Sequence, residues 1–188
     1  MLNSQGSRFK VQRAWGIIAA IVFTATPALA MVVLPADFSE MVTSSELVVH
    51  ARVVDVRPQM SGDRRTIETM VTVTVLDSLK GDPGATVYFR VPGGQVGRYR
   101  RVMVGAPEFA SGDEVVLFLR GRAPAVPMPF GLSQGVYRVA RKSDGRAMVT
   151  PPVVSDSVGR VVRGDPARRP LELSAFEREV RAAAERQQ

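Results

Sequence analysis

Residues 66–79, TIETMVTVTVLDSL, carry the most regular alternation of apolar and polar side chains in the sequence. Successive side chains of a β-strand point to opposite sides of the sheet, so this period of two predicts a strand with one face in the core. The core face is expected to hold Ile67, Val71, Val73 and Val75. The opposite face carries Glu68, Thr72 and Thr74 and is expected to be more exposed.

Segments on both sides of this strand also have strand character. Residues 114–119, EVVLFL, form a nearly continuous apolar run, which is typical of a strand buried on both faces. Further strands are predicted at 47–57, 86–91, 96–104, 135–141 and 146–149, with a short one at 158–162 in a Pro- and Arg-rich arm over 153–170. Turns or loops are expected at 58–65, 80–84, 92–94, 105–113, 120–130 and 143–145.

In the strand at 47–57, the alternation assigns side chains to two faces. One face is expected to carry Val49, Ala51 and Val53. The other is expected to carry Val48, His50, Arg52, Val54 and Val56.

Two helices are predicted at the ends of this run of strands. Asp37 is a suitable cap for a short helix. Ser174 is expected to cap a second helix that ends near Arg186, with Phe176, Val180 and Ala183 as its apolar stripe. Because the strands follow one another without helices between them, the order favours an antiparallel sheet, closed into a barrel or folded as a sandwich, over βαβ units.

The first thirty residues predict a secretory signal peptide. Arg8, Lys10 and Arg13 precede an apolar run over 14–25, and Ala28-Leu29-Ala30 matches the small-x-small pattern of a cleavage site. Cleavage is expected after Ala30, and the mature protein is expected in the periplasm or outside the cell. The predicted organisation is a signal peptide over 1–30, a β-barrel domain with an extended arm over 31–170, and a C-terminal helix over 171–188.

Composition restricts the chemistry of the chain. It contains no cysteine, which excludes disulfides, thiol nucleophiles and zinc–thiolate sites. His50 is the single histidine, and its predicted place is a half-exposed strand position; a ligand or pH-sensing role is the alternative. The sequence assigns no catalytic, metal-binding or cofactor-binding residue, and no cofactor is expected.

The order of several motifs resembles that of known exported β domains. The motifs are VVHARVV at 48–54, VLDSLKG at 75–81, PGG at 92–94, GAPEFASGDEVVLFL at 105–119 and QGVYRV at 134–139. They resemble a group of exported bacterial domains of uncharacterised function and, more distantly, the netrin-like barrels that include the tissue inhibitors of metalloproteinases. The resemblance covers about half of the chain. It implies a mostly β, OB-like antiparallel barrel of five to seven strands, with a short N-terminal helix and a C-terminal helix outside it.

The function of those inhibitors depends on a residue that this chain lacks. They chelate the zinc of the protease through an N-terminal cysteine, whereas this chain contains none and its expected mature terminus is Met31. The resemblance therefore supports the fold more than the activity. A role as an inhibitor or accessory partner of an extracellular peptidase is kept as an alternative.

The candidate interaction surface combines arginines and aromatic residues on neighbouring strands. It comprises Arg98, Tyr99, Arg100 and Arg101, together with Tyr88 and Arg90 of the preceding strand and Phe109 of the loop at 105–113. OB-folds use such combinations to bind single-stranded nucleic acid, but export makes nucleic acid an unexpected ligand. An anionic envelope component, such as a glycan or a lipopolysaccharide phosphate, or an acidic secreted protein fits better. The competing interpretation is that these charges solvate an edge strand and prevent aggregation.

The leading functional hypothesis is therefore an exported, non-enzymatic binding module that uses residues 92–101 and 105–113. A carboxylate-dependent hydrolase is the weakest hypothesis, because the acidic residues are scattered and sequence selects no pair. Gly131-Leu132-Ser133-Gln134-Gly135 matches G-x-S-x-G literally, but no histidine follows it. It is interpreted as a glycine-rich entry into a strand.

Overall fold

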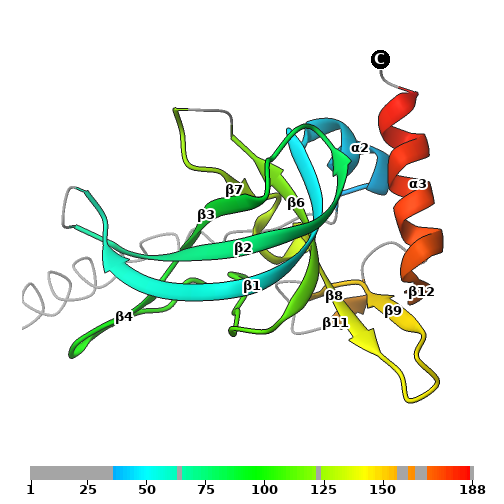
Figure 1. The fold of residues 1–188 in the computed structure, drawn as a ribbon. Helices are drawn as coiled ribbons and strands as arrows, with labels where there is room; N and C mark the ends of the chain where they lie inside the picture. The colour runs from blue at the N-terminus through cyan, green and yellow to red at the C-terminus, as the bar shows by residue number, and fades with distance from the viewer. Residues whose placement is uncertain (1–35, 63–64, 122–123, 156–160, 164–168, 187–188) are drawn as a thin grey trace, which may run out of the picture. The chain divides into compact units, whose positions relative to one another are not determined.

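The computed structural model describes residues 36–62, 65–121, 124–155, 161–163 and 169–186 (Figure 1). The predicted signal peptide at 1–30 and the apolar lead-in at 31–35 lie outside the described residues. The described chain is mostly β, as predicted, with an eight-stranded antiparallel sheet and two α-helices. None of the helices within the described ranges has the length and hydropathy needed to span a membrane.

The main sheet has the order β12-β9-β8-β6-β1-β2-β3, and β7 pairs with β6 beside this path. Its strands are β1 (Leu47–Met60), β2 (Ile67–Lys80), β3 (Thr86–Pro92), β6 (Glu114–Arg120), β7 (Met128–Pro129), β8 (Val136–Arg141), β9 (Ala147–Thr150) and β12 (Leu171–Glu172). The prediction of five to seven strands is too low for this sheet. The two-residue strands β7 and β12 are too short for a side-chain period to reveal them.

Two small antiparallel pairs accompany the main sheet. They are β4 (Gly94–Val96) with β5 (Tyr99–Arg101), and β10 (Val153–Ser155) with β11 (Val161–Arg163). The predicted single strand at 96–104 is therefore wrong: the chain reverses at Gly97, whose φ of 56° lies in the left-handed region that glycine adopts readily. Of the strand predicted at 158–162, residues 158–160 lie outside the described residues. Its last two residues belong to β11.

The core lies on both faces of the central strands β1 and β6. Val115, Val116, Leu117, Phe118 and Leu119 of β6 are all fully buried, as the apolar run predicted. Alternate residues enter different clusters: Val116 and Phe118 pack with the two helices, whereas Val115, Leu117 and Leu119 pack with β2 and β3. The inward face of β2 is confirmed, because Ile67, Val71 and Val73 are buried and Val75 packs against the same cluster.

Strand β1 differs from its prediction in length and in one side-chain assignment. It extends through Pro58 to Met60, where a loop was predicted, because Met60 still pairs with Ile67 of β2. Val56 packs against the cluster that contains Val53, rather than lying on the opposite face. The cause is a register shift between Val53 and Asp55, since one extra residue in a strand reverses the faces of those that follow.

The two helices pack together on one side of the sheet (Figure 1). Helix α2 (Phe38–Ser44) begins after Asp37, as predicted, but the Asp37 side chain makes no capping hydrogen bond. Helix α3 (Leu173–Glu185) begins one residue before the predicted cap Ser174 and follows Glu172 instead. Its predicted stripe of Phe176, Val180 and Ala183 is buried against the core.

The Leu79-Lys80-Gly81 motif has structural roles in this fold. Leu79 is buried, and Lys80 Nζ donates hydrogen bonds to the carbonyl oxygens of Val42 (2.6 Å) and Thr43 (3.1 Å) at the end of α2. Gly81 has a φ of 81°, and a Cβ there would lie 2.7 Å from the carbonyl oxygen of Glu46. The motif therefore connects the end of β2 to α2 and the start of β1.

Candidate functional site

A cavity of about 300 Å³ lies where the two segments predicted to form the interaction surface meet. The β4–β5 hairpin supplies Arg100 and Arg101, and the loop after it supplies Glu108 and Phe109. The rest of the lining comes from the ends of β1, β2 and β3 and from the turn after β5: Val56, Pro58, Thr69, Val91, Pro92, Gly93, Gly94, Val102, Met103, Ala106 and Pro107. Residues far apart in the sequence thus form one concave surface.

The Pro92-Gly93-Gly94 turn positions the hairpin over the sheet. Gly93 and Gly94 have φ angles of 98° and 135°, which residues other than glycine rarely adopt. A Cβ on Gly94 would lie 2.6 Å from Thr69 Oγ1, which itself donates a hydrogen bond to the Gly93 carbonyl (2.8 Å). Glycine is therefore required here by both backbone conformation and close packing.

The opposite wall of the cavity is held by contacts with the sheet and the core. Phe109 packs edge-on against the buried Phe89, with 5.3 Å between the ring centroids. Arg138 of β8 donates to the Glu108 carbonyl and to Asp113 Oδ2 (2.8 Å). These contacts fix the loop in place, so the cavity is formed before any ligand binds.

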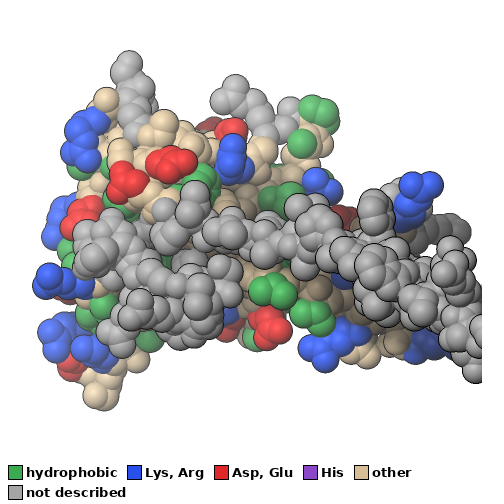
Figure 2. Space-filling model, turned by 180° about the vertical axis from the view of Figure 1, so that it is seen from behind, with side chains coloured by type: hydrophobic (Ala, Val, Ile, Leu, Met, Phe, Trp, Pro, Cys, Tyr) green, Lys and Arg blue, Asp and Glu red, His purple; other side chains and the backbone are tan. Residues whose placement is uncertain are grey.

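The arginines of the hairpin differ from most others in the described part of the chain in their ion pairing. Within the described part of the chain, no carboxylate lies within ion-pair distance of Arg98, Arg100 or Arg101, although Arg98 stacks on the ring of Tyr99, with 5.2 Å from its Cζ to the ring centroid. Other arginines pair with acids: Arg52, Arg57, Arg90, Arg138, Arg141, Arg146 and Arg181. On the face in Figure 2, visible basic and acidic side chains are interspersed. The hairpin therefore carries a local positive charge, and Glu108 is the one acidic side chain among the described residues that line the same cavity.

The predicted interaction residues do not all meet at this cavity. Arg100, Arg101 and Phe109 line it. Arg90 pairs with Glu68 (3.6 Å), and Tyr88 lines a separate cavity of about 590 Å³ near Pro83 and Pro124. The apolar lining, chiefly Val91 and Met103, was missed, because no sequence pattern distinguishes a cavity wall from a core face.

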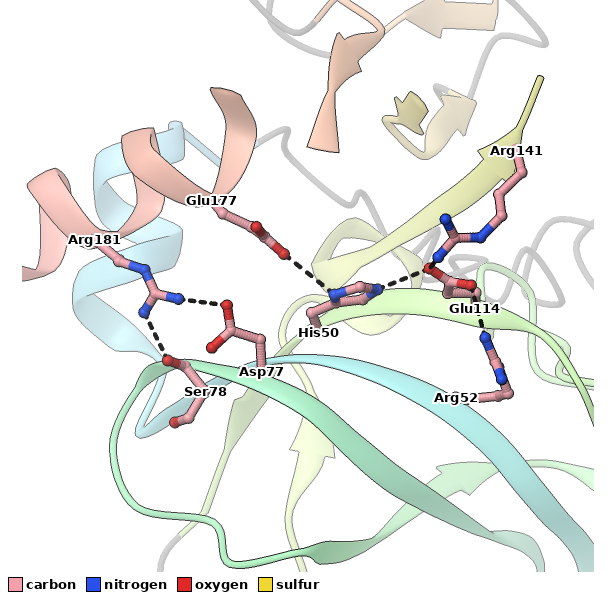
Figure 3. Close-up of polar contacts among 8 residues, drawn as sticks. All are labelled: His50, Arg52, Asp77, Ser78, Glu114, Arg141, Glu177 and Arg181. Carbon is pink, nitrogen blue, oxygen red and sulfur yellow. Dashed lines mark hydrogen bonds and ion pairs between the residues drawn. The ribbon is translucent and has the colours of Figure 1, made fainter. Parts of the chain in front are cut away.

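A second polar site surrounds His50 at the junction of β1, β6 and α3 (Figure 3). His50 is only 7 % exposed, which corrects the prediction of a half-exposed residue. Its Nε2 lies 3.0 Å from Glu114 Oε1, and its Nδ1 lies 3.1 Å from Glu177 Oε1 of helix α3. A carboxylate thus faces each ring nitrogen, and the imidazole joins the helix to the sheet.

Glu114 is the centre of this site. Its carboxylate also accepts hydrogen bonds from Arg52 (3.1 Å) and Arg141 (2.8 Å). Burial acts to raise the pKa of the Glu114 carboxyl, but the hydrogen bonds from His50, Arg52 and Arg141 outweigh it and hold the pKa below its ordinary value. Glu114 is therefore an ionised, fully paired group rather than a proton donor.

A second connection holds α3 next to the same site. Arg181 forms an ion pair with Asp77 of β2 and donates to the Ser78 carbonyl (2.8 Å), as Figure 3 shows. With the contact between Glu177 and His50, the polar face of α3 is bound to the sheet at two positions. This arrangement indicates a structural role for the site.

Within the described residues, neither the His50 site nor Ser133 has the arrangement of groups expected of a hydrolase. The lining of the cavities described above does not include His50, Glu114 or Glu177. Ser133 follows a left-handed Gly131 in a short 3-10 helix (Leu132–Gly135) and leads into β8 at Val136, close to the predicted glycine-rich strand entry. It lines a cavity of about 300 Å³ whose described lining contains no His, Asp or Glu. Across the described residues, no three His, Cys, Asp or Glu side chains gather closely enough to hold a metal ion.

Comparison of the chain with protein-family models, with curated proteins and with solved structures found no match. The functional argument therefore depends on the residues and geometry given above.

Proposed function

We propose that this protein is an exported, non-enzymatic binding module that holds an anionic ligand at the cavity between the β4–β5 hairpin and the loop at 105–113. The observation that carries the proposal is the pair Arg100 and Arg101, which line this cavity without a carboxylate partner in the described structure. The expected ligands are an anionic envelope component or an acidic secreted protein.

The chemistry of the lining supports an anionic ligand with an apolar part. The guanidinium group binds carboxylate and phosphate through two parallel hydrogen bonds. Glu108 is the one acidic side chain among the described lining residues, so the cavity keeps a net positive charge. Val91, Met103 and Phe109 provide an apolar surface beside the two arginines.

We further propose that the sheet belongs to the OB-like barrels. Strand β1 pairs with both β2 and β6, and β7 pairs with β6. The Arg90 amide of β3 donates to the carbonyl oxygen of Pro127 (2.9 Å), immediately before β7. This contact links the two ends of the path β3-β2-β1-β6-β7. If the barrel is closed in solution, the Arg90 amide should exchange slowly with solvent hydrogen, and rapid exchange would argue for an open sheet.

Export is tested by the terminus of the mature protein. Cleavage after Ala30 should leave Met31 as the first residue when the protein is recovered from the envelope or the medium of its host. Recovery of residues 1–30 on a membrane-embedded species would contradict this part of the proposal.

Ligand binding is tested with a polyanion that contains no lipid. The wild-type protein is applied to immobilised heparin, a sulfated polysaccharide, and eluted with increasing salt. Salt elutes the protein because it screens exposed charges over about 8 Å at physiological ionic strength. The double variant Arg100→Gln/Arg101→Gln should elute at lower salt, because two fewer positive charges contact the heparin. The melting temperature should be unchanged, since both side chains are exposed.

A matched control separates the site from overall charge. Arg178→Gln/Arg186→Gln removes the same charge from exposed positions on α3 and its C-terminal end. This control should elute with the wild type. Equal losses in both double variants would show that net charge alone governs retention, and the arginines of the hairpin would then be a solvated edge.

A further inference from the structure

Residues 98–104, RYRRVMV, expose apolar side chains beside the unpaired arginines. Val104 and Val102 are 87 % and 70 % exposed, which makes them the most exposed large hydrophobic side chains of the described residues. Tyr99 is 59 % exposed. Exposed apolar side chains grouped in one short segment next to charged residues are a feature of surfaces that contact a partner.

The position of this segment leaves it accessible. Residues 99–101 pair with β4 in a two-stranded sheet of their own, in which β4 packs against β1 and β2, and the Ala106 amide donates to the Met103 carbonyl in the turn that follows (3.1 Å). In Figure 1 the β4 strand lies at the end of β1 and β2 opposite helix α3. The segment is thus anchored at both ends, and the strand that pairs with it lies away from helix α3.

We infer that residues 98–104 dock on a membrane surface that carries anionic lipids. Arginines at such a surface meet lipid phosphates, while tyrosine and valine side chains enter the boundary between headgroups and acyl chains. The inference rests on the proposed function, because it names the partner of the same arginine cluster.

The exposed valines distinguish a lipid surface from other anionic partners. A soluble polyanion without an apolar part would engage the arginines and leave Val104, which lies outside the cavity lining, in water. A surface that offers negative charge above an apolar layer satisfies both kinds of side chain at once. This double complementarity favours lipid as the occupant.

The test measures co-sedimentation of the purified protein with vesicles of phosphatidylcholine alone and of phosphatidylcholine with phosphatidylglycerol. Four proteins are compared: wild type, Val102→Ser/Val104→Ser, Arg100→Gln/Arg101→Gln and the control Arg178→Gln/Arg186→Gln. All share the same N-terminus, so any binding through that terminus is common to them. Retention on heparin is measured for each protein in parallel, and melting temperatures confirm that each variant is folded.

Wild type and the control should bind the anionic vesicles at low salt, and high salt should release them. The valine variant should partition about tenfold less while keeping its retention on heparin, because it loses apolar burial but no charge. The arginine variant should lose about thirtyfold on vesicles and also elute earlier from heparin.

The outcomes separate this inference from the proposed function. Equal sedimentation of wild type and the valine variant, or equal binding to neutral and anionic vesicles, would overturn the inference. Arginine-dependent retention on heparin without any vesicle binding would assign the site to a soluble acidic macromolecule, which overturns the inference and keeps the proposed function. If the wild type binds neither vesicles nor heparin, both the inference and the proposed function are overturned.

Discussion

The region around His50 and the segment at 98–104 differ in whether their charged side chains are paired. At His50, the Glu114 carboxylate, whose side chain is 9 % exposed, accepts from an imidazole and two guanidinium groups. In the segment, three arginines lie beside exposed valines, and no carboxylate is within ion-pair distance in the described structure. Charges paired around a largely buried carboxylate stabilise one arrangement of β1, β6 and α3, whereas the exposed arginines of the segment are available to a ligand. Substitutions in the two regions should therefore affect different measurements.

The largest effect on stability is expected in the core strand that supports the His50 region. Phe118 is fully buried and contacts Phe38, Tyr137 and Phe176. Phe118→Ala should lower the free energy of unfolding by about 3–5 kcal/mol, because it leaves a cavity among these rings. Denaturant unfolding measures the loss. A cost below about 1 kcal/mol would show that β6 is not the central strand.

The next largest effect is expected at Glu114. Glu114→Gln keeps the shape of the side chain and removes the negative charge that His50, Arg52 and Arg141 share. The free energy of unfolding should fall by about 2 kcal/mol, because the three donors lose the negative charge that they face and glutamine keeps only one of the two acceptor oxygens. Asp144→Asn is the control, since the Asp144–Arg146 pair is exposed in a hairpin turn, and it should unfold with the wild type. If both variants have the same free energy of unfolding, the ion pairs around Glu114 contribute no more to stability than an exposed pair does.

The pH dependence of stability sharpens the same contrast. The pKa of Glu114 is lower in the folded protein than its ordinary value of 4.5, so folding favours the ionised carboxylate. The stabilising contribution is therefore complete above pH 4.5 and is lost as the pH falls through the lower folded value. The difference in free energy of unfolding between wild type and Glu114→Gln should shrink on acidification. A difference that grows below pH 4.5 would reverse the assigned direction.

The smallest effect on stability is expected in the segment at 98–104. Val102→Ser/Val104→Ser should change the free energy of unfolding by less than about 0.5 kcal/mol, because neither side chain is in the core. Thermal unfolding in parallel with the vesicle measurements checks this. A large destabilisation would mean that these valines pack against part of the protein, and vesicle results with this variant would then report on folding.

Much of the fold could be predicted from local pattern. The period of two in 66–79 and the continuous apolar run at 114–119 identified β2 and β6, because both the pleat and burial act residue by residue along a strand. The apolar stripe of 176, 180 and 183 identified α3 for the same reason. The length of β1 and the bulge after Val53 escaped prediction, since both depend on the partner strand β2.

The candidate site was predicted in its segments but not in its geometry. Residues 92–101 and 105–113 were expected to form one surface, and the structure brings them to one cavity. The hairpin at Gly97 was missed, because a single glycine in a run of strand-forming residues signals a bulge or a turn equally well. Tyr88 was grouped with the arginines by its strand, yet it lines a different cavity.

The sequence by itself determined the β class of the protein, its two helices, and the absence of thiol chemistry. These follow from residue type and from periods of two and 3.6, which are local properties. Tertiary structure alone decided which charges are paired. His50 meets Glu114 and Glu177 through the packing of β6 and α3 on β1. Arg100 and Arg101 have no carboxylate within ion-pair distance in the described structure, although their hairpin packs against β1 and β2. An ion pair requires two side chains within 4 Å, and no pattern along the chain specifies that distance.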